Sequence, residues 1–108
     1  MAKRIVFYNP KVAAALARWP AGIAAGFTAI SQSMVAHGPN LGLPYTRAMG
    51  KGLFEIRARG TEGVGRAFFC MLSGQQIVIL HGFIKKSQKT PLADLRLAQK
   101  RLKELHHD

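Results

Sequence analysis

The chain has 108 residues, which is enough for one domain with its own core and too few for two. Apolar residues make up 48% of it and no low-complexity tract occurs, so a disordered chain is excluded. Sixteen Lys and Arg stand against five Asp and Glu, and the net charge is +11. All five acids come after residue 50. Such an excess of positive charge favours nucleic acid, an acidic protein or an anionic membrane as the partner.

Disulfide and metal chemistry are not expected from the composition. Cys70 is the single cysteine and lies in an apolar run, so it is expected to be a small core residue rather than a nucleophile. His106 and His107 stand together at the end of the chain, while His37 and His81 have no companions at metal-ligand spacing. We therefore expect neither a metal nor a cofactor.

The uncharged run at residues 19–46 requires a membrane check, because Gly22 and Gly26 match a small-xxx-small helix-pairing pattern. A span needs about 20 predominantly apolar residues. This run begins with Pro20, contains several Ser, Thr and Gln residues, and is rich in Ala and Gly. It therefore predicts a helix of a soluble protein, with no membrane partner. No signal peptide is expected either, because Lys3 and Arg4 lead into a strand-like segment and Asn9–Pro10 interrupts any apolar stretch.

The N-terminal part is expected to form a strand and two helices. Residues 3–8 are mostly β-branched and aromatic, which favours a strand. Asn9 before Pro10 predicts a helix start, because Asn caps helices and proline fits the first helical position. This helix should run to about Trp19. The second helix should end at Gly38, and its apolar positions are Ile23, Phe27, Ile30 and Met34. The break between the two predicts an antiparallel helical hairpin.

The C-terminal part is expected to form three strands and a helix. Residues 38–52 are rich in Gly and Pro and are expected to be a loop. Residues 53–59, 64–72 and 76–84 predict an antiparallel meander with short turns. A helix should begin at Thr90–Pro91, with a core stripe of Leu92, Leu95, Leu102 and Leu105. The fold class is therefore α+β, a single domain over residues 1–108 with helices packed against one small sheet.

Two arginines are expected to face each other in this sheet. If residues 60–63 form a simple hairpin, Arg57 lies opposite Arg66 and Arg59 opposite Val64. Like charges so placed destabilise the pair unless an anion or a carboxylate lies between them. Glu55 could provide that carboxylate. The lysines that follow residue 84 (Lys85, Lys86 and Lys89) favour an anion site instead.

Other polar residues allow two interpretations each. His81 shares strand parity with Ile79 and Phe83, and a buried histidine with a hydrogen-bonding partner is expected ahead of a general base. Arg96, Lys100 and Lys103 form a row on the last helix. That row is either a solvated helix face or a set of residues that bind the RNA backbone.

Three segments together resemble a known family. They are residues 52–57 (GLFEIR), the strand in which Arg66 precedes Phe68 and Phe69, and residues 79–91 (ILHGFIKKSQKTP). This pattern is similar to the phage-derived HigB-like toxins of the RelE/ParE superfamily. The resemblance implies a RelE-like fold and the cytoplasmic toxin of a type II toxin–antitoxin system. Such a toxin cleaves mRNA in the ribosomal A site by 2′-hydroxyl attack without metal, and a helix-turn-helix antitoxin neutralises it.

The resemblance also implies roles for particular residues. Arg57 and Arg66 would bind the scissile phosphate, and Lys85 and Lys86 would hold the backbone or supply protons. Further contacts with messenger or ribosomal RNA are expected from Lys51, Arg59, His81, Lys89, Arg96 and Lys100.

One departure from the superfamily concerns proton transfer. Several of its nucleases carry a proton-transferring tyrosine or histidine near the chain end. In this chain Phe83 occupies the corresponding strand end, and the remaining candidates for proton transfer near the terminus are His106 and His107. The general base therefore stays open. Two other functions also stay open: a gyrase poison that binds a topoisomerase, and a decayed toxin that only binds its antitoxin and regulates transcription.

Overall fold

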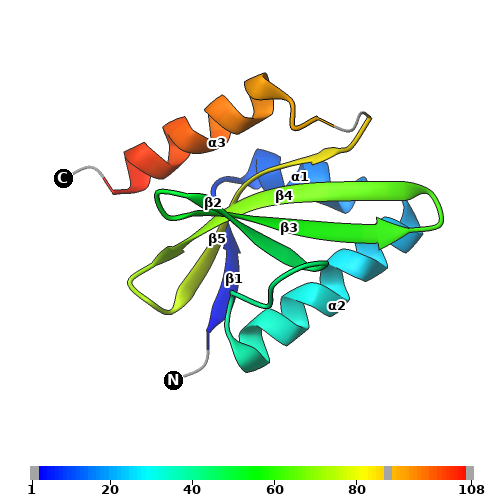
Figure 1. Ribbon diagram of the computed structural model, residues 1–108, viewed down its shortest axis with the longest axis horizontal. Helices are drawn as coiled ribbons and strands as arrows, with labels where there is room; N and C mark the ends of the chain where they lie inside the picture. The colour runs from blue at the N-terminus through cyan, green and yellow to red at the C-terminus, as the bar shows by residue number, and fades with distance from the viewer. Residues whose placement is uncertain (1–2, 87–88, 107–108) are drawn as a thin grey trace.

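The chain folds into an α+β domain with helices packed on one sheet, as the sequence predicts, but the sheet has five strands rather than the four expected (Figure 1). The computed structural model describes residues 3–86 and 89–106. Its elements are β1 (Arg4–Phe7), α1 (Pro10–Ala17), α2 (Ala21–His37), β2 (Thr46–Gly50), β3 (Leu53–Gly60), β4 (Gly63–Leu72), β5 (Gln76–Ile84) and α3 (Leu92–Leu105). The strand order is β1-β5-β4-β3-β2, with β1 parallel to β5 and every other pair antiparallel.

The helices α1 and α2 cover one face of the sheet. The side chain of Asn9 accepts a hydrogen bond from the Val12 N–H at 2.9 Å, and Pro10 begins α1, so the expected helix start is confirmed. The two helices pack mainly on the sheet, α1 against β5 and α2 against β3. Their buried residues form one core with the sheet, and those of α2 include Ile23, Ile30 and Met34.

The glycines of α2 allow close packing on the β3–β4 hairpin. A Cβ atom on Gly26 would lie 2.6 Å from the backbone oxygen of Arg59, which no side chain tolerates. Gly60 lies equally tightly against the backbone of Gly22. The small-xxx-small pattern therefore serves contact between a helix and a sheet. No helix among the described residues is long and apolar enough to cross a membrane.

The prediction of a loop over residues 38–52 was wrong in part, because β2 lies within it. This strand pairs with β3, with Thr46 opposite Ile56 and Arg47 opposite Glu55. It is a short, partly exposed edge strand without strict apolar alternation, so its sequence gives little strand signal. A turn of three residues with positive φ then leads into β3.

The helix α3 covers the other face of the sheet, over β4 and β5 (Figure 1). Ala98 is fully buried at the centre of its contact, and Leu95, Leu102 and Leu105 pack against the same core. The expected stripe is wrong at Leu92, which is 62% exposed. Leu92 precedes Ala98 by six positions, and at 3.6 residues per turn it points about 120° away from the buried face.

Candidate nucleic-acid interface

Arg57 and Arg66 lie directly opposite each other on β3 and β4. The same register pairs Arg59 with Val64 and closes the hairpin at Gly60 and Gly63, as the sequence predicts. The β3–β4 register alternates sides, so Glu55, Arg57 and Arg59 share the face that α3 covers. The hairpin therefore brings several charged side chains to one end of this face.

A buried carboxylate lies among the arginines. Glu55 is fully buried, and its oxygens lie 3.3 Å from Arg47 Nη2, 3.9 Å from Arg57 Nη1 and 3.5 Å from Arg66 Nε. The neutralising carboxylate considered from the sequence is therefore present. Three guanidinium groups against one carboxylate still leave two positive charges (3 − 1 = 2) in the group. The cluster Arg47–Glu55–Arg57–Arg66 is called the arginine cluster below.

The two facing arginines differ in their access to solvent. The Arg66 side chain is 3% exposed, and its Nη1 donates a hydrogen bond to Thr90 Oγ1 at 3.1 Å, just ahead of α3. Burial lowers the pKa of Arg66, with Arg57 and Arg47 adding to the effect and Glu55 opposing it. The Arg57 side chain is 18% exposed. Arg57 is therefore better able to touch a ligand, while Arg66 anchors the cluster.

Lys85 extends the positive charge at the end of β5. Its N–H donates a hydrogen bond to the Val64 carbonyl at 2.8 Å, so Lys85 continues the β4–β5 pairing. Desolvation lowers the pKa of Lys85, and the charges of Arg66, Arg57 and Arg59 lower it further, while Glu55 opposes them. The structure thus brings Lys85 within electrostatic reach of the arginine cluster.

The other two lysines of this segment are exposed. Lys86 lines a hollow of about 460 Å³ between β5 and the start of α3, together with Phe83, Pro91 and Asp94. Lys89 lies on the connection to α3. Residues 87–88 between them lie outside the described residues.

His81 faces α3, contrary to the expected parity with Ile79. Phe68 pairs with His81 but Phe69 pairs with Ile79, so Leu80 is an extra residue that forms a β-bulge. A bulge shifts the side-chain alternation beyond it by one residue. His81 and Phe83 therefore lie on the same face as the arginine cluster, so the expected parity of His81 holds with Phe83 and was wrong with Ile79.

The His81 ring is held by two neighbours. Its Nε2 lies 2.5 Å from Asp94 Oδ1 in the first turn of α3. Its ring stacks on Phe83, with the two centroids 5.9 Å apart. The side chains of His81 and Asp94 are 20% and 28% exposed. The expected hydrogen-bonding partner of His81 is therefore confirmed, although the ring is only partly buried.

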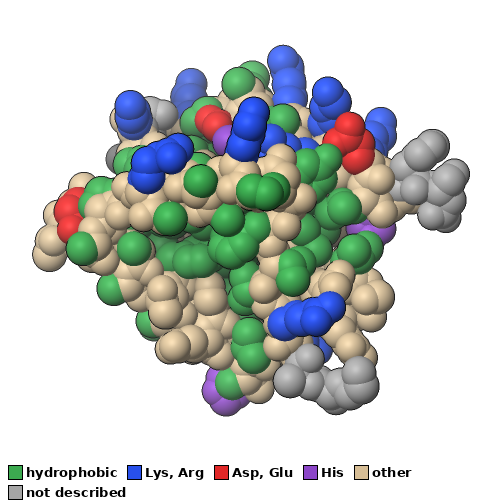
Figure 2. Space-filling model, turned by 180° about the vertical axis from the view of Figure 1, so that it is seen from behind, with side chains coloured by type: hydrophobic (Ala, Val, Ile, Leu, Met, Phe, Trp, Pro, Cys, Tyr) green, Lys and Arg blue, Asp and Glu red, His purple; other side chains and the backbone are tan. Residues whose placement is uncertain are grey.

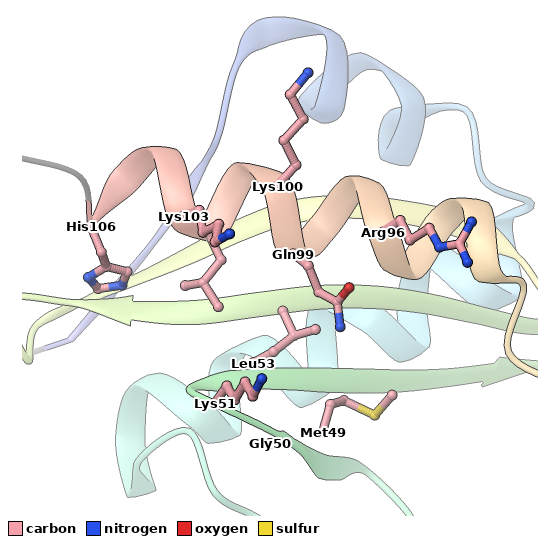
Figure 3. A pocket seen from close by; sticks show the side chains of 10 residues that line it. Met49, Gly50, Lys51, Leu53, Arg96, Gln99, Lys100, Lys103 and His106 are labelled. Carbon is pink, nitrogen blue, oxygen red and sulfur yellow. The ribbon is translucent and has the colours of Figure 1, made fainter.

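A second basic region lies beside the C-terminal half of α3 (Figure 3). It is a groove of about 800 Å³ between α3 and the β2–β3 turn. Its basic residues are Lys51, Arg96, Lys100, Lys103 and His106, and its apolar residues are Met49, Leu53 and Leu102. Figure 3 shows Lys51 on the turn across from the helix. No acidic residue of the described chain lines this groove, which we call the α3 groove.

The candidate residues thus fall into two regions. Arg57, Arg59, Arg66, Lys85 and His81 gather at the N-terminal end of α3. Lys51, Arg96 and Lys100 line the α3 groove. In Figure 2, Lys and Arg side chains crowd the upper part of the molecule, the side on which α3 lies in Figure 1.

His106 lies apart from the arginine cluster, and three other residues in or near that cluster were missed from the sequence. His106 lies at the far end of α3 from Thr90, roughly 20 Å away for a helix of this length. His107 lies outside the described residues. Sequence reasoning missed Arg47, Thr90 and Asp94. Recognition of β2 would have found Arg47, whereas Thr90 and Asp94 gave no signal, because only the docking of α3 brings them to the sheet.

Comparison with known families now defines the class of protein. Residues 14–103 match the family described as Phage derived protein Gp49-like (DUF891). The match spans most of the chain, so the protein belongs to the Gp49-like family of phage-derived proteins. This family is commonly of the RelE/HigB toxin type, and the chain is in that sense a toxin-like protein. No curated protein matches it.

Proposed function

We propose that the protein is the HigB-like toxin of a type II toxin–antitoxin system and acts as a ribosome-dependent endoribonuclease. Its substrate is mRNA in the ribosomal A site, and its inhibitor is a helix-turn-helix antitoxin in the cytoplasm. The observation that carries the proposal is the arginine cluster. Two guanidinium groups face each other with one shared carboxylate, and the positive charge left over suits a phosphate group.

Phosphate binding at this cluster is the first step. Arg57 is partly exposed and can donate two parallel hydrogen bonds to a phosphate, which an arginine fork does well. Arg66 is fixed by Glu55 and Thr90, so its charge acts on the phosphate from a constant position. Fixed positive groups stabilise the charge that grows on a pentacoordinate phosphorus. Cleavage by the 2′-hydroxyl of RNA needs this stabilisation and alignment of the backbone.

Lys85 can protonate the leaving oxygen. Desolvation and the neighbouring arginines lower its pKa, which makes its ammonium group a stronger acid than an ordinary lysine. Lys85 also pairs with Val64 of β4, and Val64 pairs on its other side with Arg59 of β3. Lys86 and Lys89 then contact the flanking backbone. The cleavage products would be a 2′,3′-cyclic phosphate and a 5′-hydroxyl.

The α3 groove supplies contacts away from the scissile bond. Lys51, Arg96 and Lys100 are exposed and line a groove that has no acidic residue among the described ones, which suits a run of phosphates. The ribosome presents ribosomal RNA around the A site, so these residues would hold the toxin on that RNA. Contacts of this kind raise affinity and its salt dependence without reading sequence.

The direct test is cleavage in a purified system. The protein, separated from its antitoxin, is mixed with a defined mRNA either free or bound to ribosomes with an open A site. The proposal predicts cuts only in the ribosome-bound mRNA, 2′,3′-cyclic phosphate ends, and no loss of activity with EDTA once the ribosomes are kept intact by added polyamine. Absence of cleavage would contradict it; inhibition of DNA supercoiling instead would identify a gyrase poison.

A further inference from the structure

The β-bulge in β5 turns His81 toward the arginine cluster. Leu80 is the extra residue, and Arg101 of α3 donates a hydrogen bond from Nη1 to its carbonyl oxygen at 2.6 Å. Arg101 in turn lies over the Tyr8 ring, 4.9 Å from its centroid. The bulge is thus held by contacts from other parts of the chain. Bulges of this kind often aim a side chain into an active site.

His81 lies close to the facing arginines. Arg66 pairs with Phe83, and Phe68 pairs with His81, so Arg66 and His81 are diagonal neighbours on one face. Diagonal neighbours in an antiparallel pair have Cα atoms about 7–8 Å apart. A phosphate bound by Arg57 and Arg66 would therefore bring its ribose near the imidazole. The hollow lined by Phe83, Lys86 and Asp94 adjoins the ring and provides room for a nucleotide.

Asp94 determines which ring nitrogen can accept a proton. Its carboxylate contacts Nε2, so Nε2 carries the hydrogen in the neutral ring and Nδ1 is left as the basic nitrogen. Stacking on Phe83 fixes the plane of the ring. Asp94 on α3 contacts the imidazole, and Arg66 on β4 is its diagonal neighbour. Arg101 reaches the carbonyl of the preceding residue, and Lys86 lines the hollow that Phe83 and Asp94 also line.

We infer that His81 is the general base of the reaction and that Asp94 is its positioning residue. This inference rests on the proposed nuclease function. The 2′-hydroxyl gives its proton to Nδ1 of His81, and its oxygen forms a bond to phosphorus. The bond from phosphorus to the 5′-oxygen breaks, and that oxygen takes a proton from the Lys85 ammonium group. Both groups then return to their starting states by exchange with water. The pair fills the role for which His106, at the far end of α3, lies too far from the cluster.

A sulfur-substituted substrate tests this assignment. A 5′-bridging sulfur at the scissile position leaves without protonation, so it removes the need for a general acid and keeps the need for a general base. Single-turnover cleavage of ribosome-bound mRNA is measured for the oxygen and sulfur substrates. His81→Gln should slow both by about 10²- to 10⁴-fold, as expected for loss of a general base. Lys85→Met should slow only the oxygen substrate. Asp94→Asn should slow both, and His37→Gln, in an exposed histidine of α2, should slow neither.

Two further measurements separate chemistry from folding. Ribosome-bound mRNA with a 2′-deoxy residue at the cleavage site cannot react, so it reports binding alone. The His81→Gln and Asp94→Asn proteins should bind this complex as tightly as the wild-type protein does. Free imidazole should restore cleavage by His81→Ala and not by Lys85→Met. Full-rate cleavage by His81→Gln, or its rescue by the sulfur substrate, would overturn the general-base role and leave the nuclease function standing. A wild-type protein that cuts neither substrate would overturn both.

Discussion

Arg57 and Arg66 face each other across β3 and β4 and share one buried carboxylate, that of Glu55. Like charges opposed in this way would by themselves weaken the strand pair. Glu55 removes that penalty and leaves an excess of positive charge, because Arg47 joins the same carboxylate from β2. The sheet can therefore hold a concentrated cationic site without a bound anion.

Replacement of Glu55 tests this balance. Glu55→Gln keeps the shape of the side chain and leaves three arginines around a neutral group, so the free energy of unfolding should fall by about 3–5 kcal/mol. Affinity for single-stranded RNA should rise at low salt, because the cluster gains one net positive charge. Urea denaturation and fluorescence anisotropy measure the two effects. Glu104→Gln, in an exposed acid of α3, is the matched control. Unchanged stability of Glu55→Gln would contradict a structural role for this carboxylate.

The two arginines should respond differently to truncation. Arg57→Ala should lower single-turnover cleavage by about 10²- to 10³-fold, the usual loss for one charge-stabilising donor. Its effect on stability should be small, since the side chain is partly exposed. Arg66→Ala should lower both activity and stability, because Glu55 loses a buried partner. Cleavage rates and urea midpoints distinguish them. Equal loss of stability in both variants would contradict the assignment of Arg66 as the anchor.

The hairpin register could be predicted from sequence, and the face of His81 could not. Gly60 and Gly63 flank a short turn, so counting outward from it opposes Arg57 to Arg66. The bulge at Leu80 depends instead on Arg101, twenty-one positions later, which takes up the Leu80 carbonyl. The alternation of apolar and polar residues in β5 does not reveal this hydrogen bond. The predicted parity of His81 with Ile79 therefore failed, next to the proposed site.

The same distinction explains the other differences. The helix start at Asn9 depends only on neighbouring residues, and its capping hydrogen bond is confirmed. The strand β2 depends on pairing with β3, and its five residues have weak strand preferences, so Arg47 was missed. Asp94 joins the site only because α3 docks with Ala98 against the sheet. Residues that tertiary packing alone brings together had no signal in the sequence.

Lys51 combines an unfavourable backbone conformation with a position in the α3 groove. Its φ of 55° is costly for a residue with a side chain, so Lys51→Gly should raise the free energy of unfolding by about 1 kcal/mol. The same change should weaken RNA binding and reduce its salt dependence by close to one counterion. The Ser73→Gly variant is the matched control, since Ser73 also has a φ of 55° and adds no charge. It should gain stability with unchanged binding. Unchanged binding by Lys51→Gly would remove Lys51 from the RNA contacts.

Glu62, in the β3–β4 turn, should make the stability of the protein depend on pH. Its carboxylate accepts the Gly22 N–H at 2.9 Å, at the start of α2, and this bond, with those from Glu62 and Ile23, lowers its pKa below 4.5. A lowered folded-state pKa adds stability above pH 4.5, which is lost as the pH falls through the folded value. Glu62→Gln should therefore be less stable than wild type near pH 7, and the difference should close in acid. Thermal denaturation from pH 3 to 7 measures it. A difference independent of pH would contradict the charge-based account.

The proposed phosphate site and the nuclease function are tested most directly by mapping new 5′ ends in cellular mRNA after brief induction of the protein. Wild type is compared with Arg57→Ala and with Arg4→Ala, in which an exposed arginine at the other edge of the sheet is lost. We expect in-frame cuts within translated codons for wild type and Arg4→Ala, and their loss in Arg57→Ala. Cuts that persist in Arg57→Ala would contradict the phosphate site. Growth arrest without any cuts would contradict the nuclease function, and neither cuts nor arrest would identify a decayed toxin.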